Sequence, residues 1–305
     1  MRISVILCTY AIERYDDFYE AAESVINQAY EPIELVVVVD GNSAVYDRVM
    51  LDFGSQQNVI IHHNNENRGV SYSRTKGAEL ASGEVVAFID DDAVAEEDWA
   101  TELAAAYEEY DAVAVGGRME GEWLVGRPWF LPTEFDWLVG VTHPGFGADG
   151  KKVRNTFESN LSFCRDVFLK LDGFNEQLGP DADSYRHSEG AEIGVRLQAE
   201  YGRGVVYNAD AVVRHKVFEH RTRIRWLLSR AFKQGVSKRR MSVEGVSSTG
   251  EESAYLLRLL IDRVPRRING IVQSPSIAAI AQLAMLFIFA ATVGIGYLYA
   301  LGRRE

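Results

Sequence analysis

The sequence predicts an α/β protein with a doubly wound, mostly parallel, Rossmann-like sheet. Apolar runs of strand length alternate with amphipathic segments of helix length over residues 1–117, at intervals of roughly 20 to 30 residues. Two of the expected strands lead into aspartates, at Asp40 and at Asp90. Because such sheets bind ligands at the carboxyl ends of their strands, these aspartates predict a ligand site at that edge.

Each expected element follows from its pattern of apolar residues. Continuous apolar runs predict strands at residues 3–7, 35–40, 59–61, 85–89 and 112–115. Helical spacing predicts helices at residues 18–29, 68–81, 100–110 and 186–199. In the first helix the spacing is carried by Ala21, Ala22, Val25 and Ile26.

The composition indicates a globular, acidic chain with reduced thiols. The 305 residues have a net charge of −12, and 47 % are hydrophobic, which is ample for a core. The basic residues are 25 arginines and 7 lysines, a balance that we associate with proteins living in high salt. Cys8 and Cys164 cannot form a disulfide framework, as expected of a cytosolic domain.

An uncharged run near the carboxyl terminus predicts one transmembrane helix, at residues 275–301. No residue from Ile277 to Leu301 is charged, and this run is about 37 Å long as a helix, enough to cross a bilayer. Basic residues precede it, namely Arg258, Arg263, Arg266 and Arg267. The positive-inside rule therefore predicts a single-pass protein of the cell membrane with a cytoplasmic amino-terminal domain. A buried core helix is the alternative.

Asp90, Asp91 and Asp92 follow the strand at residues 85–89 and form the first candidate site. Three adjacent carboxylates repel one another unless a cation neutralises them. Mg²⁺ or Mn²⁺, held by one or two carboxylates and by substrate phosphates, is the usual solution. An acidic turn without a ligand is the alternative. A calcium loop is disfavoured because no glycine stands at its sixth position.

Neither glycine-rich motif that binds dinucleotides or triphosphates follows the expected strands. What remains is a nucleotide site built from carboxylates and a metal ion. Asp40 could then accept hydrogen bonds from a base or ribose, and the aspartate triplet could take the ribose and diphosphate.

A series of motifs resembles the inverting family 2 glycosyltransferases, which have the GT-A fold. The motifs are Cys8-Thr9-Tyr10, Val39-Asp40-Gly41-Asn42-Ser43, Asn67-Arg68-Gly69 with Arg74, Asp90-Asp91-Asp92, Asn160-Leu161-Ser162-Phe163, Gly173-Phe174-Asn175-Glu176, Glu189-Gly190-Ala191-Glu192 with Arg196-Leu197, and residues 209–215 ending in His215. The resemblance implies that Thr9, Tyr10 and Asp40 hold the nucleotide. It also implies that Asp90 or Asp91 meets the ribose and that Asp92 binds the metal.

The chain departs from the family pattern at two glycines. The family often has a second acid where Gly41 stands, and an acidic pair where this chain has Glu189 followed by Gly190. The second departure leaves the identity of the catalytic base open between Glu189 and Glu192.

Sugar transfer requires stabilisation of the departing diphosphate and removal of a proton from the acceptor hydroxyl. A metal ion at Asp92 would act as a Lewis acid, with His215 as a second candidate ligand, and Arg74 or His215 could add positive charge. A general base, Glu189 or Glu192, would take the proton. On a helix these two residues share a face, and a solvated acidic face is the alternative. A sugar hydroxyl needs a base and a lipid phosphate does not, so we expect a sugar acceptor.

An irregular aromatic segment at residues 118–158 is expected in the acceptor half of the enzyme. Its rings can stack on a sugar, or they can pack in the core or on the membrane. They are Trp123, Trp129, Phe130, Phe135, Trp137, His143 and Phe146.

Residues 216–270 are expected to form a basic juxtamembrane segment. Between Arg214 and Arg240 there are ten bases and one acid, in a chain that is otherwise acidic. Apolar residues there recur at helical spacing, at Ile224, Leu227, Leu228, Ala231 and Phe232. This pattern predicts an amphipathic helix lying in a membrane interface. A nucleic-acid site is disfavoured by the adjoining membrane span, and a solvated helix packed on the catalytic domain is the alternative.

Together these features predict a membrane-anchored glycosyltransferase with a catalytic domain at residues 1–215. Residues 1–117 would bind the nucleotide-sugar and residues 118–215 the acceptor. The enzyme is expected to move a hexose or hexuronic acid from a nucleotide-sugar to a dolichyl or polyprenyl phosphate-linked saccharide. It resembles haloarchaeal enzymes that build dolichol-linked glycans for N-glycosylation of the S-layer protein. The alternatives are a polyprenyl-phosphate monosaccharide synthase and a non-catalytic scaffold.

Overall fold

The computed structural model describes residues 1–176, 178, 189–243 and 249–302, and the chain divides into two compact units. The sheet unit comprises Met1–Glu120 and Gly147–Lys216. The helical unit comprises Gly121–Phe146 and Val217–Glu305. The aromatic segment, expected in the acceptor half, is therefore split, and its residues 121–146 belong to the helical unit.

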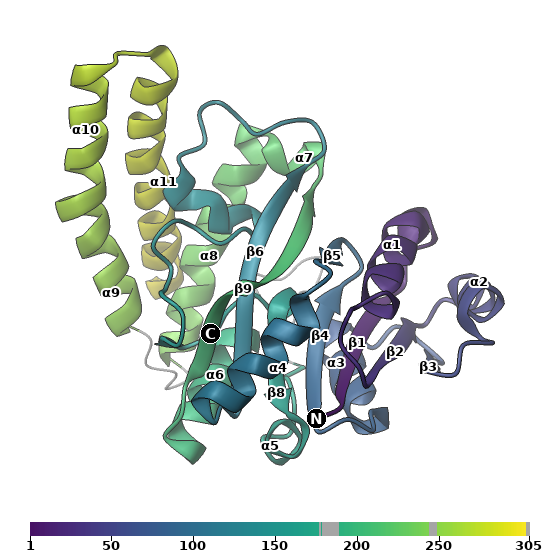
Figure 1. Cartoon of the computed structure of the whole chain (residues 1–305). Coiled ribbons are helices and arrows are strands. Elements are labelled where there is room, and N and C mark those ends of the chain that lie inside the picture. The colour runs from purple at the N-terminus through teal and green to yellow at the C-terminus, as the bar shows by residue number, and fades with distance from the viewer. Residues whose placement is uncertain (177, 179–188, 244–248, 303–305) are drawn as a thin grey trace. The chain divides into compact units, whose positions relative to one another are not determined.

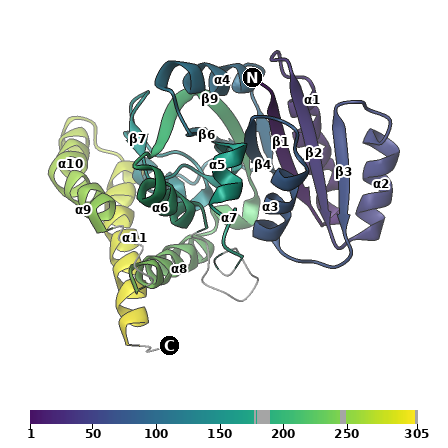
Figure 2. The ribbon, with the colours of Figure 1, turned by 90° about the horizontal axis from the view of Figure 1, so that it is seen from below.

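The sheet unit is built on one mixed sheet (Figures 1 and 2). Its order is β3-β2-β1-β4-β8-β6-β9-β5, with β7 paired to β9. Neighbouring strands from β3 to β4 are parallel, and β8 pairs antiparallel with both β4 and β6. The strands are β1 (Ile3–Thr9), β2 (Ile33–Asp40), β3 (Val59–Asn64), β4 (Val85–Asp90), β5 (Ala93–Ala95), β6 (Ala114–Trp123), β7 (Lys152–Val153), β8 (Leu161–Cys164) and β9 (Val205–Val217).

The five expected strands and the expected helices of this unit are present, and most bounds differ by a few residues. The strand expected at residues 112–115 is longer, because β6 runs to Trp123, and residues 186–188 of the expected helix 186–199 lie outside the described residues. The helical elements are η1 (Ile12–Arg14), α1 (Tyr15–Ile26), α2 (Ser43–Phe53), α3 (Val70–Leu80), α4 (Trp99–Tyr110), η3 (Glu158–Asn160), α5 (Arg165–Lys170) and α6 (Glu189–Tyr201). Helix α2 was not expected. Its start is fixed by Asn42, whose side-chain oxygen accepts hydrogen bonds from the amides of Ala44 and Val45, a standard N-cap.

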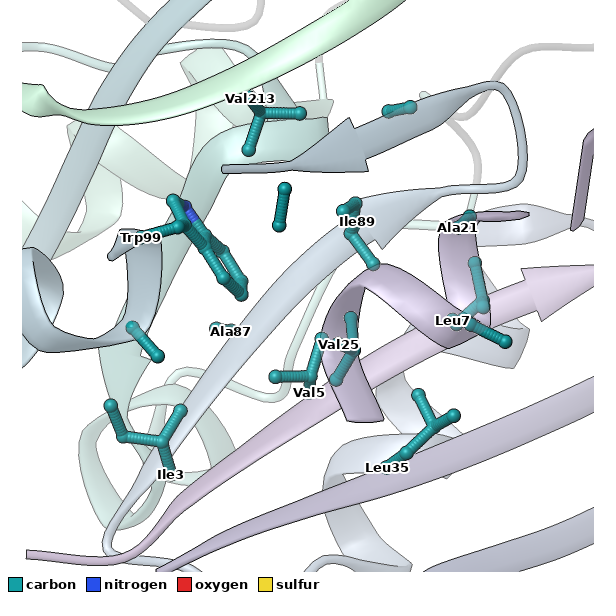
Figure 3. Close-up of a cluster of buried hydrophobic side chains, with 14 of the residues drawn as sticks. Ile3, Val5, Leu7, Ala21, Val25, Leu35, Ala87, Ile89, Trp99 and Val213 are labelled. Atoms are coloured by element: carbon teal, nitrogen blue, oxygen red, sulfur yellow. The ribbon is translucent and has the colours of Figure 1, made fainter. Parts of the chain in front are cut away.

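Alternate residues of the central strands point to opposite faces of the sheet and build two hydrophobic layers. On one face Val5, Leu7 and Ile89 pack with Val25 of α1 and Trp99 of α4, all of them buried (Figure 3). On the other face Phe88 contacts Phe168 of α5 and Phe174, at ring-centroid distances of 5.1 and 5.0 Å. Burial of the strands on both faces explains why they are continuous apolar runs in the sequence.

The helical unit is built from α-helices, the 3₁₀ helix η2 and the π-helical turn η4 around a small core. The elements are η2 (Thr133–Val139), α7 (Glu219–Thr222), α8 (Ile224–Val243), α9 (Thr249–Arg258), η4 (Leu259–Arg263), α10 (Val264–Gln273) and α11 (Ile277–Leu301). The core joins Phe135 of η2, Leu227 and Ala231 of α8, and Leu286 and Phe289 of α11. Most rings of the aromatic segment pack on this core, whereas Trp129 is exposed.

The middle of the apolar stripe expected on the basic helix α8 is covered by protein, whereas Ile224 at its start is 44 % exposed. Its central residues Leu227 and Ala231 are fully buried against α11. The two helices approach closely at glycines, because a Cβ at Gly235 would lie 2.0 Å from the Val293 carbonyl oxygen. The sequence pattern identified the helix correctly, but the partner of its apolar stripe is another helix.

Helix α11 has the bounds of the expected uncharged run. It is the one described helix that is long and apolar enough to cross a membrane. Leu286 and Phe289 lie in the core of the unit, while Ile288, Ile295 and Leu298 are exposed.

Candidate active site

Four parallel strands of the sheet unit end side by side, and their last residues are polar. The strand registers pair Cys8 with Asp90 and Asp40 with Asn64, so the carboxyl ends of β1, β2, β3 and β4 form one edge. The strands that carry this edge are seen side by side in Figure 2. This is the edge at which α/β sheets bind their ligands.

Asp40 organises the turn that lies over this edge. Its carboxylate accepts hydrogen bonds from the side-chain amide of Asn64 (2.8 Å) and from the backbone N–H groups of Arg68 (2.9 Å) and Gly69 (2.8 Å). Gly41 has a φ of 74°, and a Cβ there would lie 2.3 Å from the Asn67 nitrogen. The close approach of residue 67 therefore excludes a second acid at this position.

Asp91 and Asp92 are buried beside one arginine. Arg14 forms an ion pair with Asp91, and its Nη2 lies 3.3 Å from Asp92 Oδ2. Thr9 donates a hydrogen bond of 3.3 Å to Asp91. Strand pairing sets His215 opposite Ala93, which brings its Nε2 to 3.5 Å from Asp92 Oδ1.

Asp90 belongs to a second cluster, centred on the buried Arg74 of α3. Arg74 Nη2 lies 2.5 Å from Asp90 Oδ1, and Nη1 lies 3.5 Å from Glu189 Oε1. Glu158 is close enough to Arg74 and Glu189 to influence the protonation of both. Arg74 thus joins the aspartate triplet to the first turn of α6.

Burial and neighbouring charges separate the acids by proton affinity. Burial raises the pKa of Asp91 to about 7, although Arg14 opposes the rise. Burial also opposes ionisation of Asp90, but Arg74 outweighs it and lowers the pKa of that carboxyl. Burial and the charge of Glu158 raise the pKa of Glu189 to about 8, with Arg74 opposing. Displaced proton affinities of this kind are common where carboxyl groups do chemistry.

The two candidate bases have different surroundings. Glu192 faces Arg196 through two hydrogen bonds, at 2.7 and 2.6 Å, which occupy both of its oxygens. Glu189 Oε2 is buried and accepts no hydrogen bond within the described part of the chain. The geometry therefore favours Glu189 as the carboxyl group that can receive a proton.

Carboxylate oxygens at this edge suit a hard divalent cation. Asp92 is the central candidate ligand, with His215 beside it. Among the described residues, no three His, Cys, Asp or Glu side chains converge on a point that could hold an ion. Asp92 and His215 would supply at most two protein ligands, and substrate phosphates commonly complete the coordination of Mg²⁺ and Mn²⁺.

The structure brings most of the expected site residues to this edge. Thr9, Asp91, Asp92 and His215 form one group, and Arg74, Asp90 and Glu189 form the other. Asp40 is in the adjacent strand, while the Tyr10 side chain is 54 % exposed and Glu192 is paired with Arg196.

Sequence reasoning missed Arg14 and Glu158. Arg14 ends the short η1 turn after β1, and Glu158 begins η3, where Ser159 accepts a hydrogen bond from the backbone N–H of Asp90. The only sequence signal for Glu158 was its place two residues before the Asn160 motif.

The mixed sheet, with its polar residues at the carboxyl ends of the parallel strands, has the GT-A fold of known glycosyltransferase structures. Known structures with this fold cover the whole chain. They include TarS of S. aureus in complex with UDP (TM-score 0.56, 16 % identity, 93 % of that chain covered). Another is the mannosyltransferase PcManGT of Pyrobaculum calidifontis in complex with GDP-Man and Mn²⁺ (TM-score 0.58, 17 % identity, 88 % of that chain covered). At these identities the likeness shows the fold alone.

The protein belongs to glycosyl transferase family 2, whose pattern matches residues 4–171. It is 48 % identical over 302 residues to the glucosyl-dolichyl phosphate glucuronosyltransferase of Haloferax volcanii, covering 99 % of this chain and 96 % of the relative. A shorter match, 34 % identical over 116 residues, relates it to the glycosyltransferase GlyA of Streptococcus pneumoniae and covers 38 % of this chain and 16 % of GlyA. The prediction of a family 2 glycosyltransferase with a GT-A fold is confirmed.

Proposed function

We propose that this protein transfers a glucuronic acid residue from a nucleotide donor to glucosyl-dolichyl phosphate. The observation that carries this proposal is the 48 % identity to the Haloferax volcanii enzyme over 99 % of the chain. That match includes both the sheet unit and the helical unit. It narrows the expected hexose or hexuronic acid to a hexuronic acid, and the expected lipid-linked saccharide to a lipid-linked glucose.

The carboxyl edge would bind the donor. Thr9, Tyr10 and Asp40 would hold the nucleotide, and Asp90 or Asp91 would meet the ribose. Mg²⁺ or Mn²⁺, held by Asp92 with His215 as the second candidate ligand, would stabilise the charge of the diphosphate as a Lewis acid. Arg74 would add positive charge at the same edge, since it already lies 2.5 Å from Asp90.

Glu189 would act as the general base of an inverting reaction. The C–O bond between the anomeric carbon and the diphosphate breaks, and a new C–O bond forms to the acceptor oxygen on the opposite face. The proton of the acceptor hydroxyl passes to Glu189, and the diphosphate leaves with the bonding electron pair. The raised pKa of Glu189 supports this role, because a base with a pKa near the working pH is effective.

Helix α11 would anchor the enzyme to the membrane that contains its lipid-linked acceptor. Its length and composition suit a single span. The sheet unit would lie on the cytoplasmic side of that span. Leu257, Leu260, Ile261 and Val272 of the α9–η4–α10 segment are exposed as well, which suits a helix lying in the interface.

The arginines that precede the span are weaker evidence for its orientation than the sequence suggested. Arg258 donates a hydrogen bond to the Gly145 carbonyl, Arg263 donates one to the Pro144 carbonyl, and Arg267 is paired with Glu134. All three hold the α9–η4–α10 segment to the rest of the helical unit.

Cysteines placed at Gln273 and Gly302, one at each end of α11, test the single span. In sealed vesicles a membrane-impermeant maleimide should label Q273C and G302C from opposite sides, with the wild type as the background control. Labelling of both cysteines from the same side would show that α11 does not cross the membrane but is inserted in one leaflet.

A transfer assay tests the substrates. The purified full chain is incubated with Mg²⁺ or Mn²⁺ and with one nucleotide-sugar donor, which carries glucuronic acid or glucose on UDP or GDP. The acceptor is either glucosyl-dolichyl phosphate or dolichyl phosphate. Mass spectrometry should show one added hexuronic acid on glucosyl-dolichyl phosphate alone. A product from dolichyl phosphate would indicate a monosaccharide synthase, and donor binding without any product would indicate a scaffold.

A further inference from the structure

Two arginines of the helical unit converge on one loop. Arg258 ends α9, and Arg263 ends the π-helical turn η4 that follows it. Arg258 Nη1 donates a hydrogen bond of 2.9 Å to the Gly145 carbonyl, and Arg263 Nη2 donates one of 3.2 Å to the neighbouring Pro144 carbonyl. A Cβ at Gly145 would lie 2.5 Å from Arg263 Nη2, so this guanidinium also lies directly against Gly145. Both positive charges are therefore held beside the same two residues of the loop.

The π-helical turn brings the two arginines to one side of their segment. Helix α9, η4 and α10 follow one another as one long helix (Figure 1). At the end of η4 the backbone N–H of Val264 bonds to the Leu259 carbonyl, five residues earlier, as in a π-helix. Arg258 and Arg263 are also five residues apart, so in this turn they are stacked, whereas in a regular α-helix they would point about 140° apart. Single π-turns of this kind are frequent at functional sites.

The contacts with the loop position the two guanidinium groups without neutralising them. The carbonyl acceptors are uncharged, and a guanidinium has five N–H donors, so each arginine can hold its carbonyl and an anion at once. Arg263 Nε lies 3.6 Å from the Asp262 carboxylate, but that carboxylate is closer to Arg266, at 2.7 Å. Both charges also act on His143, because its pKa is lowered by burial and further by Arg263 and Arg258.

The surroundings of this pair suit the surface of a membrane. Arg258 is exposed, and so are Leu257, Leu260 and Ile261 of the same segment. Exposed apolar side chains beside arginines are typical of a helix in a membrane interface, where the cations lie at the depth of the lipid phosphates. Guanidinium groups bind phosphate through paired hydrogen bonds that an ammonium group cannot form. A lipid phosphate is therefore the anion that fits this site.

We propose that Arg258 and Arg263 form a binding site for a lipid phosphodiester. Glucosyl-dolichyl phosphate and anionic phospholipids both contain this group, and the binding of each can be measured separately. With the acceptor bound, the site would hold its phosphate at the membrane surface and leave its glucose free to receive the next sugar. That assignment to the acceptor rests on the proposed function.

Native mass spectrometry of the full chain in detergent tests the site without any transfer reaction. The chain is titrated with glucosyl-dolichyl phosphate, phosphatidylglycerol or phosphatidylcholine, and the bound fraction gives a Kd for each lipid. Phosphatidylcholine has no net charge and controls for apolar contacts. A lower Kd for glucosyl-dolichyl phosphate than for phosphatidylglycerol assigns the site to the acceptor, and the reverse order assigns it to phospholipid headgroups. Equal Kd values for all three lipids would overturn the proposal.

Lysine variants separate a phosphate site from attraction by charge alone. Arg258→Lys and Arg263→Lys keep the positive charge but remove the planar guanidinium. Each should raise the Kd of the preferred anionic lipid by about tenfold, the usual worth of a hydrogen bond to a charged group. The Kd of phosphatidylcholine should not change. Lysine variants that bind like the wild type would show that no guanidinium site holds the phosphate.

Arg225→Gln is the matched control for the loss of one charge. Arg225 is an exposed arginine of α8 in the same unit, and R225Q removes one positive charge, as R258Q does. Attraction without direct contact is worth about fivefold for each arginine, so R225Q should raise the Kd by no more than that. R258Q should raise it by tenfold or more. Equal changes in the two variants would contradict the assignment to Arg258.

Hydrogen exchange of the wild type locates the bound lipid without any substitution, and so decides the matter even if a variant fails to fold. The preferred anionic lipid, but not phosphatidylcholine, should slow backbone exchange at residues 140–146 and 253–273. Protection confined to other segments would place the phosphate elsewhere and overturn the proposal.

Kinetics separate this inference from the proposed function. If the acceptor is the preferred lipid, R258K should raise its KM by about tenfold, while kcat and the donor KM stay largely unchanged. If the wild type transfers no glucuronic acid, the proposed substrates are wrong, and the titration with phosphatidylglycerol still tests the phosphate site.

Discussion

In the helical unit each buried acid of η2 has an arginine of its own. Arg267 contacts both oxygens of Glu134, at 2.9 and 2.5 Å, and Arg127 Nη2 lies 2.5 Å from Asp136 Oδ1. In the sheet unit a larger set of acids shares Arg14 and Arg74, with His215 beside one of them. The set consists of Asp90, Asp91, Asp92, Glu158 and Glu189.

This difference separates a structural network from a functional one. The acids of η2 are balanced within the fold, so they hold the aromatic segment in place without any ligand. The acids at the carboxyl edge outnumber the described arginines beside them, and ionising all of them is costly unless a proton, a metal ion or a substrate compensates their charge. A buried acid is therefore a better functional candidate when it shares its arginine than when it has one of its own.

The largest effect should come from Asp92→Asn. Loss of the central candidate metal ligand is expected to reduce the transfer rate by about 10³-fold, because a Lewis acid supplies several kcal/mol of transition-state stabilisation. The unfolding temperature should not fall, since one buried negative charge is removed. Transfer kinetics, Mn²⁺ titration and thermal unfolding are the measurements. Undiminished Mn²⁺ binding in D92N would assign the metal to other residues.

Glu189→Gln should reduce the transfer rate by about 10²- to 10⁴-fold, the usual contribution of a general base, while donor binding stays unchanged. Glu192→Gln is the matched variant on the same helix. It breaks the pair with Arg196 and should cost about 1 to 2 kcal/mol of stability, but it should change the rate by less than tenfold. Equal rate losses in the two variants would contradict the assignment of the base to Glu189.

The parallel part of the sheet was predictable from sequence because its strands are buried on both faces, whereas β5, β7, β8 and β9 were not expected. Residues 35–40 and 85–89 are continuous apolar runs, and parallel strands place the polar residues that follow them at one edge. Helix α2 was missed because its apolar residues Val45, Val49 and Phe53 are sparse, although Asn42 was a usable cap signal.

The helical unit and the cluster around Arg74 were harder to predict from the sequence. The spacing of Leu227 and Ala231 correctly predicts a helix with one apolar side, but spacing cannot say whether a membrane or α11 covers that side. Glu158 reaches this cluster only through tertiary structure, since it contacts Gly190, which lies 32 residues away in sequence. Single-sequence patterns contain no signal for such a contact.

In the helical unit, Glu134→Gln should lower stability by about 2 kcal/mol through loss of charged hydrogen bonds to Arg267. Burial disfavours ionised Glu134, but Arg267 outweighs it and lowers the pKa. The stabilisation is therefore present above the ordinary pKa of a glutamate and is lost as the pH falls through the lowered value. Thermal unfolding should show E134Q to be less stable than the wild type at pH 7. At pH 3 the two proteins should have almost the same stability. The same difference at both values would mean that the ion pair is not its source.

The smallest effect should come from Asp136→Asn in the same network. Burial raises the pKa of Asp136 to about 6, with Arg127 opposing, so the native state keeps a proton that the unfolded chain loses at about pH 4. Its stabilising contribution is complete below pH 4 and is lost as the pH rises to about 6. Asparagine is neutral throughout and still offers Arg127 an oxygen. D136N should therefore match wild type at pH 4 and be more stable at pH 7 by up to about 1 kcal/mol, a shift in unfolding temperature of about 2 to 4 °C.

The transfer rate of D136N should be unchanged, because this acid already has an arginine of its own. A tenfold loss of rate would show that balanced acids also take part in catalysis, and charge balance would then no longer separate the two networks.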